Sequence, residues 1–300
     1  MIYLEHFGLR ERPFGITPDT SFFCSCRSHQ EGLNTLAFAA TNGEGFIKIT
    51  GEVGTGKTLL CRKFLATLGP KWVTAYIPNP NVSPRTLLFT LAGELGCAPE
   101  SHLDEHLLME LINARLVGIA DAGEHALVCI DEAQAMPVKT LETVRLLTNL
   151  ETEKRKLMQV VLFGQPELDG KLARPEIRQL RQRITFEHRL APLTRAETEH
   201  YLAHRMIVAG YAGGGVLSRA AARVVYGASG GVPRLVNILA HKALMLAYGR
   251  GVRHVRWSDA RAAVRDTPAA AAPRRALAWL GLVGVAGLCV GAGTLLGWLQ

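Results

Sequence analysis

The sequence predicts an α/β protein with a parallel β-sheet covered by helices on both faces, followed by an all-helical lobe. Three observations support this prediction. Short apolar runs alternate with stretches of helical periodicity from about residue 45 to about residue 190, a pattern typical of parallel sheets. A glycine-rich motif with the spacing G-x-x-x-x-G-K-[ST] follows the first apolar run. Beyond residue 191 only helical patterns remain.

The glycine-rich motif has the sequence context that a phosphate-binding loop requires. The run before it, residues 45–50 (GFIKIT), is short, apolar and β-branched, and therefore predicts a buried strand. After it, Leu60, Phe64 and Leu68 recur at four-residue spacing, which predicts a helix. A loop between a strand and a helix N-terminus directs backbone N–H groups toward phosphate oxygens. The predicted nucleotide-binding residues are Gly51, Glu52, Val53, Gly54, Thr55, Gly56, Lys57 and Thr58.

Two side chains of this loop receive chemical roles. In a phosphate-binding loop the lysine, here Lys57, contacts the β- and γ-phosphates, and the hydroxyl, here Thr58, ligates Mg²⁺. The motif therefore predicts ATP and Mg²⁺ as the ligands of this site.

A second motif follows the third predicted strand, residues 126–130 (ALVCI). Asp131 comes directly after this strand and is a candidate to hold Mg²⁺ through its water shell. Glu132, the next residue, is a candidate to orient and deprotonate an attacking water. A solvated Asp-Glu turn is the alternative, but the position about seventy residues after a phosphate-binding loop favours the catalytic interpretation.

The remaining elements follow from apolar periodicity and from turn residues. Further strands are predicted at 72–77, 158–163 and 184–186, and helices at 28–40, 84–95, 103–120, 141–150, 175–181 and 234–248.

Polar residues near the later strands are further candidates. Gln165 comes just after the fourth strand, where its amide would touch the γ-phosphate or the water. Arg183 ends a basic cluster with Arg178 and Arg181, which would supply an arginine finger to a neighbouring subunit. A solvated basic helix face is the alternative for this cluster. The finger interpretation implies a homo-oligomer.

Arg234 begins a long predicted helix after the turn residues 230–233 (GGVP). A cation at a helix N-terminus opposes the helix dipole, so a nearby phosphate would explain it. A solvent-facing arginine is the alternative.

The C-terminal stretch predicts a membrane anchor. Residues 276–299 contain no charged side chain over 24 positions. At about 1.5 Å per residue they form about 36 Å of helix, enough to cross a hydrocarbon core of about 30 Å. Arg274 and Arg275 come directly before the stretch and favour a cytoplasmic location for that side. Residues 1–12 lack the apolar core of a signal peptide, so we expect the preceding domains in the cytoplasm.

Six stretches of the sequence together carry a family resemblance. They are residues 6–9 (HFGL), 13–14 (PF), 44–58 (EGFIKITGEVGTGKT), 130–134 (IDEAQ), 164–168 (GQPEL) and 231–234 (GVPR). With them the chain resembles the AAA+ ATPases of type II secretion and type IV pilus assembly, the general secretion pathway protein A and MSHA pilus biogenesis ATPase family.

The resemblance implies a sheet order of 5-1-4-3-2, with Gln165 as sensor 1, Arg234 as sensor 2 and Arg183 as the finger. The secretion relatives continue into a periplasmic peptidoglycan-binding region. This chain stops at Gln300, so we expect no wall binding and favour the pilus branch.

The sequence thus predicts a membrane-anchored AAA+ ATPase of the bacterial inner membrane that assists pilus or secretion assembly proteins. The formal net charge of +8 also suits nucleic acid, so a DNA-binding helper ATPase is the alternative. A nucleotide-gated scaffold with little hydrolysis is a third interpretation. The expected domains are a lead-in of the ATPase domain at 1–44, the P-loop core at 45–190, a helical lid at 191–266, a linker at 267–275 and the transmembrane helix at 276–299.

Overall fold

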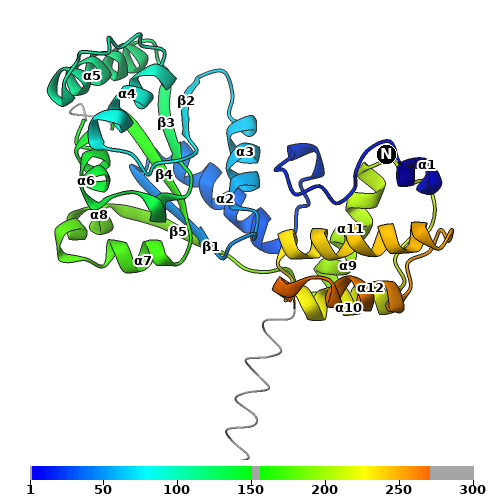
Figure 1. The fold of residues 1–300 in the computed structure, drawn as a ribbon. Coiled ribbons are helices and arrows are strands. Elements are labelled where there is room, and N and C mark those ends of the chain that lie inside the picture. Colours follow the sequence, from blue (N-terminus) through cyan, green and yellow to red (C-terminus); the bar gives the residue numbers. More distant parts are fainter. Residues whose placement is uncertain (1, 151–155, 271–300) are drawn as a thin grey trace, which may run out of the picture. The chain divides into compact units, whose positions relative to one another are not determined.

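The computed structural model of the protein describes residues 2–150 and 156–270. The described chain forms two compact units (Figure 1). We call residues 17–192 the sheet unit, and residues 2–16 together with 193–270 the helical unit. Residues 1–44, expected to be one lead-in, are therefore shared between the two units.

The sheet unit contains five parallel strands in the order β2-β3-β4-β1-β5, which confirms the predicted order 5-1-4-3-2. At the amino ends, Phe46 of β1 lies beside Val160 of β4 and Ile184 of β5. The strands lie within a few residues of their predicted positions. They are β1 Phe46–Gly51, β2 Trp72–Ile77, β3 His125–Ile130, β4 Met158–Gly164 and β5 Ile184–Leu190.

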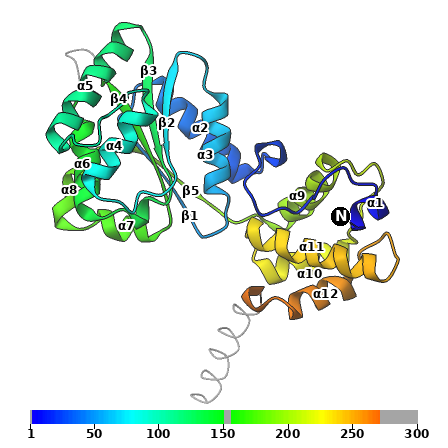
Figure 2. The same ribbon diagram turned by 45° about the horizontal axis from the view of Figure 1, so that its top comes forward.

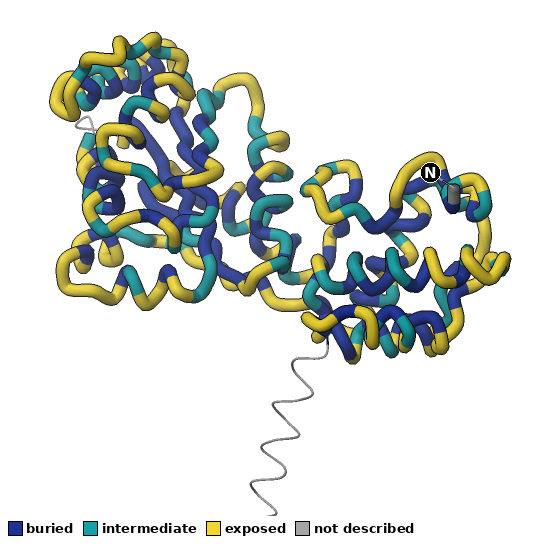
Figure 3. Tube along the Cα trace, in the orientation of Figure 1, coloured by how far each residue is buried: buried dark blue, intermediate teal, exposed yellow. Residues whose placement is uncertain are grey.

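Side chains of the central strands alternate between two apolar cores, one on each face of the sheet. In β3, Leu127 and Cys129 join the core formed with α2 (Arg27–Thr41) and α3 (Lys57–Thr67). Val128 and Ile130 join the core formed with α4 (Pro84–Glu94), α5 (Glu105–Asp121) and α6 (Val138–Leu147). Figures 1 and 2 show these two helical layers, and Figure 3 shows the buried strands between them. A parallel sheet needs this double cover because both of its faces are apolar.

The helices of the sheet unit begin and end at recognisable sequence signals. Ser83 caps α4 by accepting from the Thr86 N–H, and Pro84 occupies the first turn. Asp104 caps α5 by accepting from the Leu107 N–H. The α-helices are α2 Arg27–Thr41, α3 Lys57–Thr67, α4 Pro84–Glu94, α5 Glu105–Asp121, α6 Val138–Leu147, α7 Glu167–Leu172 and α8 Arg178–Gln182, with 3-10 turns η1 Thr20–Phe22, η2 Ala133–Ala135 and η3 Pro175–Ile177.

The helical unit joins two segments that are far apart in the sequence. The buried Arg205 of α9 donates to the carbonyls of Pro13 and, at 3.3 Å, of Gly15. Asn237 of α11 also donates to the Gly15 carbonyl, at 3.2 Å. These bonds fix the N-terminal segment onto the later helices. The helices are α1 Ile2–Phe7, α9 Arg195–Val208, α10 Arg219–Ser229, α11 Pro233–Gly249 and α12 Trp257–Arg265.

Within the described ranges, no helix is both long and apolar enough to cross a membrane. The anchor predicted for residues 276–299 lies outside those ranges, as do the last residues of the predicted linker.

Candidate active site

The predicted site residues of the sheet unit converge on one edge of the sheet. Strands β3, β4 and β1 are neighbours and run in parallel, so their carboxyl ends lie side by side. Asp131 and Glu132 follow β3, Gln165 follows β4, and the loop of residues 51–58 follows β1. In open α/β sheets, ligands bind at this edge.

The loop conformation depends on glycine at two positions. Gly54 has φ of +81° and Gly56 has φ of +101°, values that other residues rarely adopt. A Cβ atom at Gly56 would also lie 2.9 Å from the His29 Nε2 atom. The Thr55 hydroxyl closes the turn by donating to the Glu52 carbonyl at 2.8 Å. The loop therefore presents a fixed backbone at the start of α3, where a helix dipole favours anions.

Lys57 lies inside this loop with 5% of its surface exposed. Its Nζ atom donates to the backbone carbonyls of Gly51 at 2.8 Å and Glu52 at 3.2 Å. Burial lowers the pKa of Lys57, and the nearby carboxylates, that of Glu132 foremost, oppose this shift. The ammonium is thus held by neutral carbonyl groups, which phosphate oxygens are able to replace with stronger charge-assisted bonds.

Asp131 is the buried acid of the site, with 2% of its surface exposed. Its Oδ2 atom accepts from the Thr58 hydroxyl at 2.6 Å and from the Tyr76 hydroxyl at 3.3 Å. Its Oδ1 atom accepts from the Glu132 N–H at 2.9 Å. Burial raises the pKa of Asp131, whereas the hydrogen bond from Thr58 lowers it. Burial, followed by the charge of Asp131, raises the pKa of Tyr76 to about 12.

The contact between Thr58 and Asp131 brings a hydroxyl and a carboxylate oxygen together. Mg²⁺ prefers hard oxygen ligands and commonly takes one or two from the protein. The buried Asp131 carboxylate, whose described hydrogen-bond donors are neutral groups, matches this preference. The donor set therefore fits Mg²⁺.

Glu132 adopts a left-handed backbone conformation with φ of +52° and ψ of +37°. Among the described non-glycine residues it is alone in having positive φ. Its Oε2 atom accepts from the Gln134 side-chain amide at 2.5 Å and from the Gln165 side-chain amide at 3.2 Å. The structure thus places Gln165 in contact with the carboxylate that was predicted to act on water.

The two predicted arginines lie elsewhere. Arg183 directly precedes β5, at the amino end of the sheet, about 20 Å from the loop given the rise of a six-residue strand. Its Nη1 atom donates to the Thr148 hydroxyl at 3.2 Å. Arg234 is the second residue of α11 and belongs to the helical unit. Neither arginine is brought to the loop within the sheet unit.

Three residues near the loop were missed as individual site candidates. Tyr76 and Gln134 contact the two acidic residues as described above, and His29 donates from Nε2 to the Thr55 carbonyl at 2.8 Å. Gln134 lies within residues 130–134 (IDEAQ), one of the stretches that carry the family resemblance, and this stretch was the signal in the sequence that could have identified it. His29 and Tyr76 carry no local signal in the sequence, because their contacts depend on how α2 and β2 pack.

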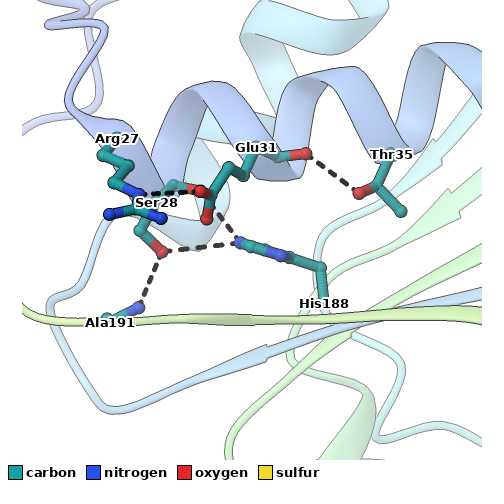
Figure 4. Close-up of polar contacts among 6 residues, drawn as sticks. All are labelled: Arg27, Ser28, Glu31, Thr35, His188 and Ala191. Carbon is teal, nitrogen blue, oxygen red and sulfur yellow. Dashed lines mark hydrogen bonds and ion pairs between the residues drawn. The ribbon is translucent and has the colours of Figure 1, made fainter.

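The N-terminus of α2, which carries His29, is fixed to the end of β5 (Figure 4). The Ser28 hydroxyl accepts from the Ala191 N–H at 2.9 Å, and the His188 Nε2 atom donates to the Ser28 carbonyl at 2.9 Å. Arg27 pairs with Glu31 on the exposed side of the helix at 2.9 Å. This attachment holds the start of α2 beside the phosphate-binding loop.

The sequence of this unit matches a known family. Residues 40–172 match the family model described as an AAA domain. The chain is also 39% identical over 258 residues to general secretion pathway protein A of Aeromonas hydrophila. The chain belongs to the AAA+ family of general secretion pathway protein A. The match covers 86% of this chain and 47% of the relative. The chain therefore spans less than half of the length of that protein.

Solved structures show the same fold at low sequence identity. The Aeropyrum pernix ORC2 protein in its ADPNP–ADP complexes has a TM-score of 0.63 at 18% identity, covering 83% of this chain and 72% of that chain. Drosophila ORC bound to DNA has a TM-score of 0.64 at 17% identity, with coverages of 85% and 64%. The Thermotoga maritima RuvB branch migration motor has a TM-score of 0.52 at 15% identity, with coverages of 79% and 67%. At these identities the likeness concerns the fold alone.

Proposed function

We propose that the protein is a membrane-tethered ATPase that assists the assembly of a type IV pilus or a type II secretion machine. The observation that carries the proposal is the meeting of Lys57, Thr58, Asp131 and Glu132 at one edge of the sheet. The identity with general secretion pathway protein A supports a role in secretion.

In this proposal the loop of residues 51–58 binds the ATP phosphates through its backbone N–H groups. Lys57 exchanges its contacts with the Gly51 and Glu52 carbonyls for phosphate oxygens. Thr58 and Asp131 hold Mg²⁺, which when bound offsets the negative charge of the phosphates.

The hydrolytic role falls to Glu132. A carboxylate within hydrogen-bond reach of a water molecule acts as a general base and takes a proton as the water oxygen attacks the γ-phosphorus. The bond from that phosphorus to the bridging oxygen breaks, and ADP leaves with the electron pair. Gln165 shares the Oε2 atom of Glu132 and so is suited to orient the same water.

The position of Arg183 supports a site completed by a second subunit. Arg183 lies at the opposite end of the sheet from the loop of its own chain, so its guanidinium would serve a neighbouring copy. We further propose that Arg234 contacts the nucleotide phosphates as sensor 2. The assignment of Arg183 requires a homo-oligomer for full activity.

The decisive experiment for ATPase function compares two variants. Glu132→Gln should retain ATP binding but lose turnover on the order of a thousandfold, because the Mg²⁺ ligands remain while the water loses its base. Lys57→Ala should weaken nucleotide binding itself. Turnover by the Glu132→Gln protein at near the parental rate contradicts the assignment of the base.

Mixing experiments test the subunit interface. Arg183→Ala should lower turnover on the order of a thousandfold while ATP still binds. Mixing it with the Glu132→Gln protein should restore some activity, because one mixed interface then contains both groups. No recovery, together with a parental rate that does not depend on protein concentration, would argue for a monomer.

The membrane tether rests on the sequence of residues 276–299. Deleting residues 274–300 should release an active ATPase from the membrane fraction. If the full-length protein remains in the supernatant after ultracentrifugation without detergent, the anchor is excluded.

The rival function is that of a DNA-binding helper ATPase, which the net charge of +8 favours. Measuring the ATPase rate against protein concentration, with DNA or with lipid, separates the two functions. Stimulation by lipid and not by DNA supports the proposal, and the reverse result supports the rival. A negligible rate under all conditions supports a nucleotide-gated scaffold.

A further inference from the structure

The Gln134 side chain bridges two residues of the proposed hydrolytic site. Its Nε2 atom donates to the Glu132 Oε2 atom at 2.5 Å. Its Oε1 atom accepts from the Gln165 backbone N–H at 3.0 Å. A carboxamide carries a donor and an acceptor on one rigid group, so it is able to tie a carboxylate after β3 to a backbone amide after β4.

The residue that Gln134 holds is backbone-strained. Glu132 has φ of +52°, a conformation that persists where the surroundings enforce it and that concentrates at functional sites. The Glu132 carbonyl also accepts from the Ala135 N–H at 2.8 Å, which closes the short η2 turn. The strained backbone and the amide of Gln134 together fix where the carboxylate lies.

Gln134 is itself held firmly. The Lys171 Nζ atom of α7 donates to the Gln134 carbonyl at 2.5 Å and to the Met136 carbonyl at 2.7 Å. Gly164, the last residue of β4, leaves room for the amide oxygen, since a Cβ atom there would lie 3.3 Å from the Gln134 Oε1 atom and 2.7 Å from the Leu168 Cδ2 atom. Two separate elements, α7 and β4, therefore converge on this glutamine.

We propose that Gln134 is a positioning residue, which holds the Glu132 carboxylate beside Gln165 so that both face the same water molecule. The inference rests on the proposed hydrolytic function and adds a residue to it. Gln134 does not take the proton itself. Its contribution is to the rate of the chemical step and not to the affinity for ATP, because it contacts neither the loop of residues 51–58 nor the Thr58–Asp131 pair among its described hydrogen bonds.

The first test replaces the amide by a side chain of similar length without polar hydrogens. Gln134→Met in the full-length protein should lower kcat by about tenfold to a hundredfold, with the Kd for ATP unchanged. The matched control is Gln159→Met. Gln159 is a buried amide of β4 that donates to the Ala40 carbonyl at 3.0 Å, and its loss should leave kcat per folded protein at the parental value.

The second test uses a readout that a purely structural glutamine would not change. In Gln134→Glu, the Nε2 donor is replaced by a carboxylate oxygen, so the hydrogen bond to Glu132 is lost while the length of the side chain is kept. The variant's kcat should fall at least as far as that of Gln134→Met, with the Kd for ATP unchanged.

The outcomes separate this inference from the proposed function. If Glu132→Gln loses turnover but Gln134→Met does not, the inference about Gln134 is overturned and the proposed function stands. A parental kcat for Gln134→Glu, or a kcat loss in Gln134→Met equal to that of Gln159→Met, also overturns the inference. A parent protein without turnover, or one that does not need Glu132, overturns the proposed function and this inference with it.

Discussion

The two units of the protein each bury an acidic side chain, but the hydrogen-bond partners of the two acids differ. In the helical unit, the buried Asp259 carboxylate accepts from the Arg250 guanidinium at 2.5 Å and from the Arg256 N–H at 2.8 Å. In the sheet unit, Lys57 is bound by two backbone carbonyls and Asp131 by two hydroxyls and one amide. The first unit neutralises its buried acid with a cation, whereas the second surrounds its charges with neutral dipoles.

Burial alone does not separate scaffolding from chemistry. Arg205 is as buried as Lys57 and also donates to neutral groups, but its guanidinium spans Pro13, Gly15 and Tyr201 and holds two chain segments together. Burial shifts the pKa of Lys57 down, against the opposing effect of nearby carboxylates, and shifts that of Asp131 up, toward the neutral form in both cases. A ligand that brings opposite charges to these two side chains is therefore favoured at the sheet edge.

The largest expected effect concerns Lys57. Lys57→Met should weaken ATP binding on the order of a thousandfold, since the charge-assisted phosphate contact is lost. The same substitution should leave the free energy of unfolding unchanged or raise it, because folding then no longer buries an ammonium group. Isothermal titration and urea unfolding measure the two quantities. A marked loss of stability would show that Lys57 holds the fold together as Arg205 does.

Arg205 should behave in the opposite way. Arg205→Met leaves the Pro13 and Gly15 carbonyls without their guanidinium donor and should lower the stability of the helical unit by about 3 kcal/mol. Hydrogen exchange should show reduced protection in residues 2–16 and α9. Unchanged protection there would mean that the N-terminal segment is held by its apolar contacts alone.

Asp131 gives a pH-dependent test of smaller size. Its folded-state pKa lies above the ordinary value of 3.8, so its ionisation opposes folding as the pH rises through the folded pKa. Asp131→Asn should therefore be more stable than the parent by on the order of 1 kcal/mol at neutral pH. The gain in stability should vanish below about pH 3.8, where Asp131 is neutral in both the folded and the unfolded protein. A gain in stability that grows toward acid pH would contradict a raised pKa of Asp131 in the folded protein.

The smallest expected effect compares two helix caps, one in each unit. Thr194 forms a capping box with Glu197 at the start of α9, and Ser83 caps α4. Thr194→Ala and Ser83→Ala should each lower stability by about 0.5–1 kcal/mol. Hydrogen exchange should localise each loss to its own unit. Equal loss of protection in both units after either substitution would show that the two units unfold together.

The sheet and the phosphate-binding loop were predictable because their signals are local in the sequence. Five apolar runs marked the strands, and the eight-residue loop motif identified Lys57 and Thr58. Asp131 and Glu132 followed from their place after a strand. The contact of Gln134 with Gln165 was not predictable, because it depends on how the turns after β3 and β4 approach each other.

The helical unit was harder to predict for a related reason. Its helices were recognisable, but nothing local indicated that residues 2–16 belong with them. The bonds that join the two parts connect residues 192 and 190 positions apart. The strand order likewise came from family resemblance, since apolar periodicity alone does not tell which strands are neighbours.

The split of the helical unit along the chain has a consequence for biosynthesis. At about 5–20 residues per second, the ribosome needs about 10–40 s to extend from Pro13 to Arg205. All strands of the sheet unit are made within that interval. Meanwhile the buried Phe7, Leu9 and Phe14 have yet to receive the helices that cover them, and they remain open to a chaperone that binds nascent apolar segments. Residues 2–16 thus leave the ribosome well before the helices that cover them are made.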